Sequence, residues 1–210
     1  SGWEFVGLHR AASEPRLLGA GLLYGLLPIA IPSLFLLMTG DLKAVGSMPG
    51  SSGAAAGISF ANLLPGAFYE ELLLRGYLFA VLRDAIGWRW TLISTSVTFG
   101  LLHMWNPGAD AQSIAIVMLA GFFLGSVFLA TQSLYAATVA HFIWNWFLAA
   151  GLHTPVSGIK VSSPDYRVVD AGPDWLTGGA WGPEGGFAAA VGVFAVMIYL
   201  YARRLRRMES

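Results

Sequence analysis

Long apolar runs, separated by polar, glycine-rich or proline-rich connections, dominate the hydrophobic pattern of this chain. A helix needs roughly 20 apolar residues to cross about 30 Å of hydrocarbon. The apolar residues within the runs do not alternate with polar ones, as strands would require. The pattern therefore predicts an all-α fold, a polytopic membrane bundle of about six transmembrane helices. These are expected at residues 17–39, 58–82, 90–105, 112–131, 134–151 and 187–201.

Composition supports a lipid environment and excludes several functions. The chain is 56% hydrophobic and 11% charged, more apolar surface than ordinary soluble packing can hide. Twelve basic residues balance twelve acidic ones, so no basic excess is present to bind nucleic acid. The chain has no cysteine, which removes disulfides, thiolate catalysis and thiolate metal ligands.

Basic residues are distributed unevenly over the predicted connections. We expect a single domain over residues 1–210, with a peptidase core at 58–151, an extracytoplasmic loop at 152–186 and a C-terminal transmembrane helix at 187–203. Loops rich in arginine and lysine stay in the cytoplasm, which predicts that both termini are cytoplasmic. The residues on that side are Arg10, Arg16, Arg83, Arg89, Arg203, Arg204, Arg206 and Arg207, against Lys43, Lys160 and Arg167 on the other.

The loop at 152–186 is open to two interpretations. A solvated linker is the simpler one. Three aromatic residues, Tyr166, Trp175 and Trp181, instead favour a packed cap over the helix ends.

Charged side chains inside a predicted span are costly and point to function. Adjacent Glu70 and Glu71 face different directions on a helix, whereas Glu71 and Arg75 lie one turn apart on the same face. We expect a buried Glu71–Arg75 ion pair that stabilises the structure. Glu70 is then left without a local counter-ion, which suits a general base, although a hydrogen bond to a neighbouring helix would also explain it.

Two further predicted helices carry histidines. His103 lies near the end of the third predicted helix. His141 and Asn145 share one face of the fifth, where both can donate hydrogen bonds to an oxygen that gains negative charge. The simpler alternative is polar contact between helices, with His103 as a packing residue.

These residues form three motifs in a fixed order: Glu70-Glu71-x-x-x-Arg75, then Phe99-x-x-x-His103, then His141-x-x-x-Asn145. The arrangement resembles the CPBP family, which includes the CAAX prenyl endopeptidases and the bacteriocin-processing, ABI-like proteins. The resemblance implies an intramembrane endopeptidase that acts on a membrane-associated protein or peptide, in a bacterial or archaeal plasma membrane. Partners would be this substrate and the lipid bilayer. No oligomeric state is predicted.

The resemblance also implies roles for the residues. Glu70 and His103 would activate a water molecule, and His141 and Asn145 would stabilise the oxyanion. Glu71, Arg75 and Phe99 would support them.

The mechanism has two versions, one without a metal ion and one with zinc. The histidines do not form a His-Glu-x-x-His zinc helix, so we favour a site without a metal or other cofactor. The alternative is a zinc peptidase with Glu70, His103 and His141 as ligands. A different class of function is a non-catalytic membrane immunity or binding protein, which would have little need of a free glutamate beside a histidine.

Overall fold

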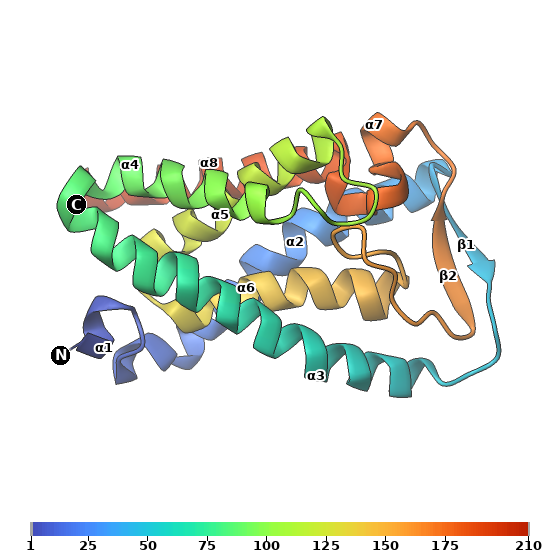
Figure 1. Cartoon of the computed structure of the whole chain (residues 1–210), viewed down its shortest axis with the longest axis horizontal. Coiled ribbons are helices and arrows are strands. Elements are labelled where there is room, and N and C mark those ends of the chain that lie inside the picture. Colours follow the sequence, from blue (N-terminus) through green and yellow to red (C-terminus); the bar gives the residue numbers. More distant parts are fainter. Residues whose placement is uncertain (1, 210) are drawn as a thin grey trace.

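The computed structural model describes residues 2–209, with side chains described from residue 3 to residue 202. The arginines at 203, 204, 206 and 207 lie outside the described side chains. The fold is mostly helical (Figure 1). The long helices are α2 (Pro15–Thr39), α3 (Ser52–Glu71), α4 (Phe79–Leu102), α5 (Ala111–Thr131), α6 (Leu134–Trp146) and α8 (Phe187–Glu209). Short helical elements are α1 (Gly2–Phe5), η1 (Arg10–Ser13), α7 (Asp174–Thr177), η4 (Gly179–Trp181) and η5 (Pro183–Gly185).

Helical elements cover the predicted spans except for residues 103–105, which form a turn, but not all of these helices are long and apolar enough to cross a membrane. Among the described residues, α2 and α5 are long and apolar enough to cross a bilayer, and α8 has a shorter apolar stretch over Phe187–Ala202. The two π-helical segments, η2 (Leu72–Leu78) and η3 (Phe147–Leu152), extend α3 and α6. A mostly helical fold with two candidate membrane-spanning helices is consistent with a membrane protein. The presence of six membrane-spanning helices remains a prediction.

A single residue reverses the chain between the second and third predicted spans. Helical structure runs from α3 through η2 into α4, and Gly87 interrupts it with φ of 76° and ψ of 156°. This left-handed region favours glycine, which lacks a Cβ. The chain turns back within α4, so that its later part runs opposite to α3 from one end of the molecule (Figure 1).

Close contact between α2 and α6 depends on small residues. Gly21 packs on the backbone of Ala136, and Gly25 packs on the backbone of Ala140, so that a Cβ at either glycine would collide with it. Such small-residue contacts are typical of membrane helices, because they bring two backbones together. The contact fixes α6, which carries His141, against the centre of the bundle.

The prediction of an all-α fold is wrong in one respect. Strands β1 (Leu42–Gly46) and β2 (Tyr166–Asp170) form a two-stranded antiparallel sheet, with Leu42 opposite Asp170 and Gly46 opposite Tyr166. Each strand is five residues long, and more than a hundred residues separate them in sequence. Their pairing is therefore a tertiary contact that local sequence patterns do not encode. The sheet lies at the end of the molecule opposite both termini (Figure 1).

The loop at 152–186 is packed against the helices in its middle part. Trp181 is 1% exposed and belongs to the main hydrophobic core, as expected for a cap, whereas Trp175 is 57% exposed. The ring of Tyr166 stacks on His153 with 4.4 Å between centroids, and its hydroxyl donates to the carbonyl of Gly151 over 2.7 Å. The segment is thus ordered against the ends of the helices and is not a simple linker.

Candidate active site

The last turn of α3 places Glu71 inside the bundle. Nη1 of Arg75, in η2, donates to Oε1 of Glu71 over 2.8 Å, and neither side chain is exposed. The predicted ion pair between these residues is confirmed.

Arg75 also joins the ion pair to two other helices. Its Nη2 donates to the carbonyl of Gly121 in α5 over 2.9 Å. Its guanidinium lies over the ring of Phe99 in α4, with 4.7 Å between Cζ and the centroid. A planar guanidinium suits both contacts, because it presents several donors at its edge and a flat face to the ring. Arg75 therefore ties the Glu71 carboxylate to α4 and α5.

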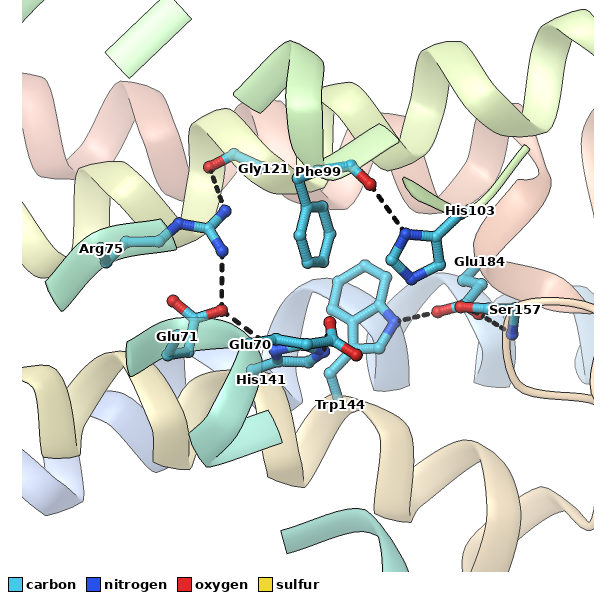
Figure 2. Close-up of polar contacts among 10 residues, drawn as sticks. All are labelled: Glu70, Glu71, Arg75, Phe99, His103, Gly121, His141, Trp144, Ser157 and Glu184. Carbon is cyan, nitrogen blue, oxygen red and sulfur yellow. Dashed lines mark hydrogen bonds and ion pairs between the residues drawn. The ribbon is translucent and has the colours of Figure 1, made fainter. Parts of the chain in front are cut away.

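His141 stands between the two glutamates. Its Nδ1 donates to Oε1 of Glu71 over 3.0 Å, and its Nε2 lies 4.0 Å from Oε2 of Glu70 (Figure 2). The ring is buried on α6 and meets the ring of Phe99 edge to face, with centroids 5.7 Å apart. The bond to Glu71 fixes the orientation of the imidazole and turns Nε2 towards Glu70.

Glu70 is less buried than its proposed role as a general base led us to expect. Its side chain is 40% exposed, whereas that of Glu71 is fully buried. A residue step of about 100° along the helix turns Glu70 away from the core and towards the surface of α3. Its Oε2 is nevertheless buried, and it has no hydrogen-bond partner among the described residues. One oxygen of Glu70 is therefore free to accept a proton or a hydrogen bond.

His103 caps the end of α4. Its Nδ1 donates to the carbonyl of Phe99 over 2.8 Å, and the two rings lie 4.8 Å apart. This hydrogen bond sets the tautomer and leaves Nε2 available. Within the part of the chain that the structure describes, no hydrogen bond or ion pair joins His103 to Glu70, whose imidazole neighbour is His141.

One cavity brings together side chains from α4, α5, α6 and the loop at 152–186. The centres of water molecules can occupy about 30 Å³ of it, so it is large enough to hold water. Its polar lining comprises His103, His141, Asn145, Ser157 and Glu184, and its apolar lining includes Phe99, Phe123 and Trp144. The cavity thus joins both histidines with Asn145, and Glu70 approaches it through its contact with His141.

Three residues of this site were not predicted from the sequence. Glu184 is 7% exposed and accepts hydrogen bonds from Nε1 of Trp144 over 2.7 Å and from Oγ of Ser157 over 3.0 Å (Figure 2). Glu184 and Ser157 lie in a glycine-rich segment without periodicity, so no spacing pointed to them. Trp144 lies one turn after His141 on the same helix, which was a signal that we could have used.

The alternative zinc site is not assembled in this structure. Among the described residues, no three histidine, aspartate or glutamate side chains are gathered closely enough to hold a metal ion. The suggested ligands Glu70, His103 and His141 therefore do not fit a metal centre in this arrangement.

Comparison with known proteins connects this site to a family. Residues 52–147 match the family described as Type II CAAX prenyl endopeptidase Rce1-like. The matched stretch includes Glu70, His103, His141 and Asn145 and ends before the loop at 152–186. No curated protein and no solved structure matches the chain. The chain therefore carries, over residues 52–147, a domain of the CPBP family of the type II CAAX prenyl endopeptidase Rce1-like kind.

Proposed function

We propose that the protein is an intramembrane endopeptidase that hydrolyses a peptide bond of a membrane-associated protein or peptide. Family membership implies a CAAX-type peptidase. The observation that carries the proposal is the different hydrogen bonding of the two adjacent carboxylates, Glu70 and Glu71. Oε1 of Glu71 accepts hydrogen bonds from Arg75 and His141, and its buried Oε2 has no hydrogen-bond partner among the described residues. Glu70 accepts no hydrogen bond from the described residues, and its buried Oε2 lies 4.0 Å from Nε2 of His141.

In the proposed reaction, Glu70 acts as the general base. It takes a proton from a water molecule, and the water oxygen bonds to the carbonyl carbon of the substrate as the carbonyl oxygen gains negative charge. Collapse of this tetrahedral intermediate breaks the carbon–nitrogen bond, and Glu70 returns the proton to the leaving amine. General acid–base catalysis of this kind is worth about 10²- to 10⁴-fold in rate. His103, whose Nε2 remains available, is proposed to hold the same water.

His141 and Asn145 are proposed to stabilise the oxyanion. Both line the cavity, and the side-chain amide of Asn145 has no hydrogen-bond partner among the described residues. His141 donates through Nδ1 to Glu71, so its Nε2 donates to the oxyanion when the ring is doubly protonated. Removal of one such donor typically costs about 10²- to 10³-fold in rate.

We further propose that the chain is one integral membrane domain with both termini in the cytoplasm. The elements that carry the basic residues of the N-terminal region, η1 and the start of α2, lie with the Gly87 turn at one end of the molecule (Figure 1). The sheet and the loop at 152–186 lie at the other end (Figure 1). This segregation supports a cytoplasmic end and an extracytoplasmic end.

The test compares Glu70→Gln with the parent protein in detergent or reconstituted membranes. The amide keeps the volume of the side chain but does not accept a proton from water. We expect cleavage to fall by about 10²-fold or more. Asp84→Asn is the matched control, because Asp84 is an exposed carboxylate remote from the cavity.

The assay mixes each purified variant with membrane-associated peptides and maps new amino termini by mass spectrometry. Prenylated and unprenylated CAAX peptides form two arms, since the family name refers to prenyl substrates. Cleavage by the parent protein that survives in Glu70→Gln would refute the mechanism. Tight peptide binding without cleavage by the parent protein would instead favour the non-catalytic binding function.

A further inference from the structure

Glu184 connects the loop at 152–186 to the cavity by hydrogen bonds from neutral donors. Oε2 accepts from Nε1 of Trp144 on α6 over 2.7 Å, and Oε1 accepts from the backbone N–H and the hydroxyl of Ser157. Within the described residues, no cation pairs with this carboxylate, which is 7% exposed. A buried carboxylate is costly unless its hydrogen bonds are kept, so these contacts hold the three residues together.

Ser157 is held from a second direction. The amide of Asn106, three residues after His103, donates to the Ser157 carbonyl over 3.0 Å. Ser157 has φ of 48°, a left-handed conformation that is strained in residues other than glycine. Such a conformation persists where surrounding contacts over-determine it, as the bonds that Ser157 donates to Glu184 and accepts from Asn106 do.

These bonds cross one end of the cavity from three directions. Glu184 and Ser157 come from the loop, Trp144 from α6, and Asn106 from the turn after α4. Figure 2 shows Glu184 and Ser157 beyond His103, on the opposite side of the cluster from Arg75. Three of these four residues line the cavity, namely Trp144, Ser157 and Glu184. The family match ends at residue 147, so both loop residues lie outside the matched stretch.

We propose that Glu184 is a positioning residue that closes this end of the cavity by tying the loop at 152–186 to Trp144. It holds the indole as a cavity wall beside Asn145 and keeps water and solutes from reaching the site through the loop end. The proposal adds a residue to the proposed peptidase site and rests on that function only for its consequence in catalysis. Closure of the cavity is a property of the folded chain with or without turnover.

The absence of cysteine from the chain makes closure measurable. Ala120→Cys introduces a single thiol into the cavity wall on α5, at the site of a small side chain. The probe is methyl methanethiosulfonate, and mass spectrometry of the intact protein follows its reaction in detergent. Circular dichroism and size-exclusion chromatography check that each variant is folded.

We expect Glu184→Ala to raise the rate of thiol modification about tenfold, because the charge-assisted bond to the indole and both bonds to Ser157 are lost. Glu184→Gln should raise it less, since its carbonyl still accepts from Ser157 while its amide cannot accept from Trp144. This second variant gives a result even if the alanine variant does not fold. Asp174→Ala is the control, because Asp174 is an exposed carboxylate of the same loop that does not line this cavity.

A double variant of Glu184 and Trp144 tests whether Glu184 closes the cavity by holding the indole or only stabilises the loop in general. If Glu184 acts through the indole, Trp144→Phe should also raise the rate, and adding Glu184→Gln to it should change the rate little further. An unchanged rate in both Glu184 variants would overturn the proposal, as would an equal rise in Asp174→Ala or fully multiplicative effects in the double variant. Because labelling needs no substrate, these results are independent of whether Glu70→Gln loses cleavage.

Discussion

Replacing Arg75 by methionine is expected to lower the free energy of unfolding by about 3–5 kcal/mol, the usual cost of leaving one charge of a buried pair uncompensated. The side chains of Arg75 and Glu71 have 0% exposure and are joined over 2.8 Å. Without the guanidinium, the Glu71 carboxylate keeps only the bond from Nδ1 of His141. Methionine retains most of the aliphatic volume, so the loss is mainly electrostatic.

Two further variants divide this cost into its parts. Arg75→Lys keeps the charge but loses the planar fork that binds the Gly121 carbonyl and lies over Phe99. We expect it to cost about 1–3 kcal/mol, from one hydrogen bond and one cation–π contact. The double variant Glu71→Gln with Arg75→Met removes both charges, and we expect it to be more stable than Arg75→Met alone.

The measurement is equilibrium unfolding in mixed micelles, with circular dichroism recorded against the fraction of denaturing detergent. Arg83→Met is the control, because Arg83 pairs with Asp84 at the surface, where such pairs contribute about 0–1 kcal/mol. Equal losses in Arg75→Met and Arg83→Met would contradict the argument from buried charge. A double variant less stable than Arg75→Met would do the same.

Three other predictions concern pH, metal and topology. The hydrogen bond from the backbone of Ser113 lowers the pKa of Asp110, the N-cap of α5, so its stabilisation is present above about pH 4 and is lost as pH falls through the folded pKa. Asp110→Asn should keep the cap but weaken this acid dependence in thermal melts, and Asp110→Ala should cost about 1 kcal/mol at neutral pH. Chelators should leave cleavage largely intact, and loss that added zinc restores would establish the metal-dependent alternative. A cysteine at Ala180 should react with an impermeant reagent outside intact cells and one at Ala85 should not, whereas the reverse pattern would invert the topology.

The parts of the fold that the sequence predicted depend on local spacing. Glu71 and Arg75 lie one helical turn apart, and the apolar runs predict the first residues of α2, α5, α6 and α8 within a few residues. Long-range contacts were beyond these patterns. The bond between Glu71 and His141 joins residues 70 positions apart, and β1 pairs with a strand more than a hundred residues away. Neither follows from periodicity, because both require the bundle to be assembled first.

The histidine that lies near Glu70 depends on the assembled bundle for a related reason. Sequence spacing placed His141 with Asn145, which share a helix, and the family resemblance paired Glu70 with His103. The structure turns His141 towards Glu70 through its bond to Glu71. His103 is instead held by the carbonyl of Phe99 on its own helix. Which imidazole faces a carboxylate depends on helix rotation, which a single sequence does not specify.

Two helices depart from α-helical geometry next to the proposed catalytic residues. The π-helical segment η2 begins directly after Glu71, and η3 begins two residues after Asn145. A π-helical turn contains an extra residue and shifts the side chains that follow it around the axis. In η2 this places Arg75 where it reaches Glu71, Gly121 and Phe99 together. The π-helical segment and the buried ion pair therefore act on the same residues. Together they fix Glu71 and, through it, the His141 ring, and leave the adjacent Glu70 as the carboxylate that accepts no hydrogen bond from the described residues and lies near Nε2 of His141.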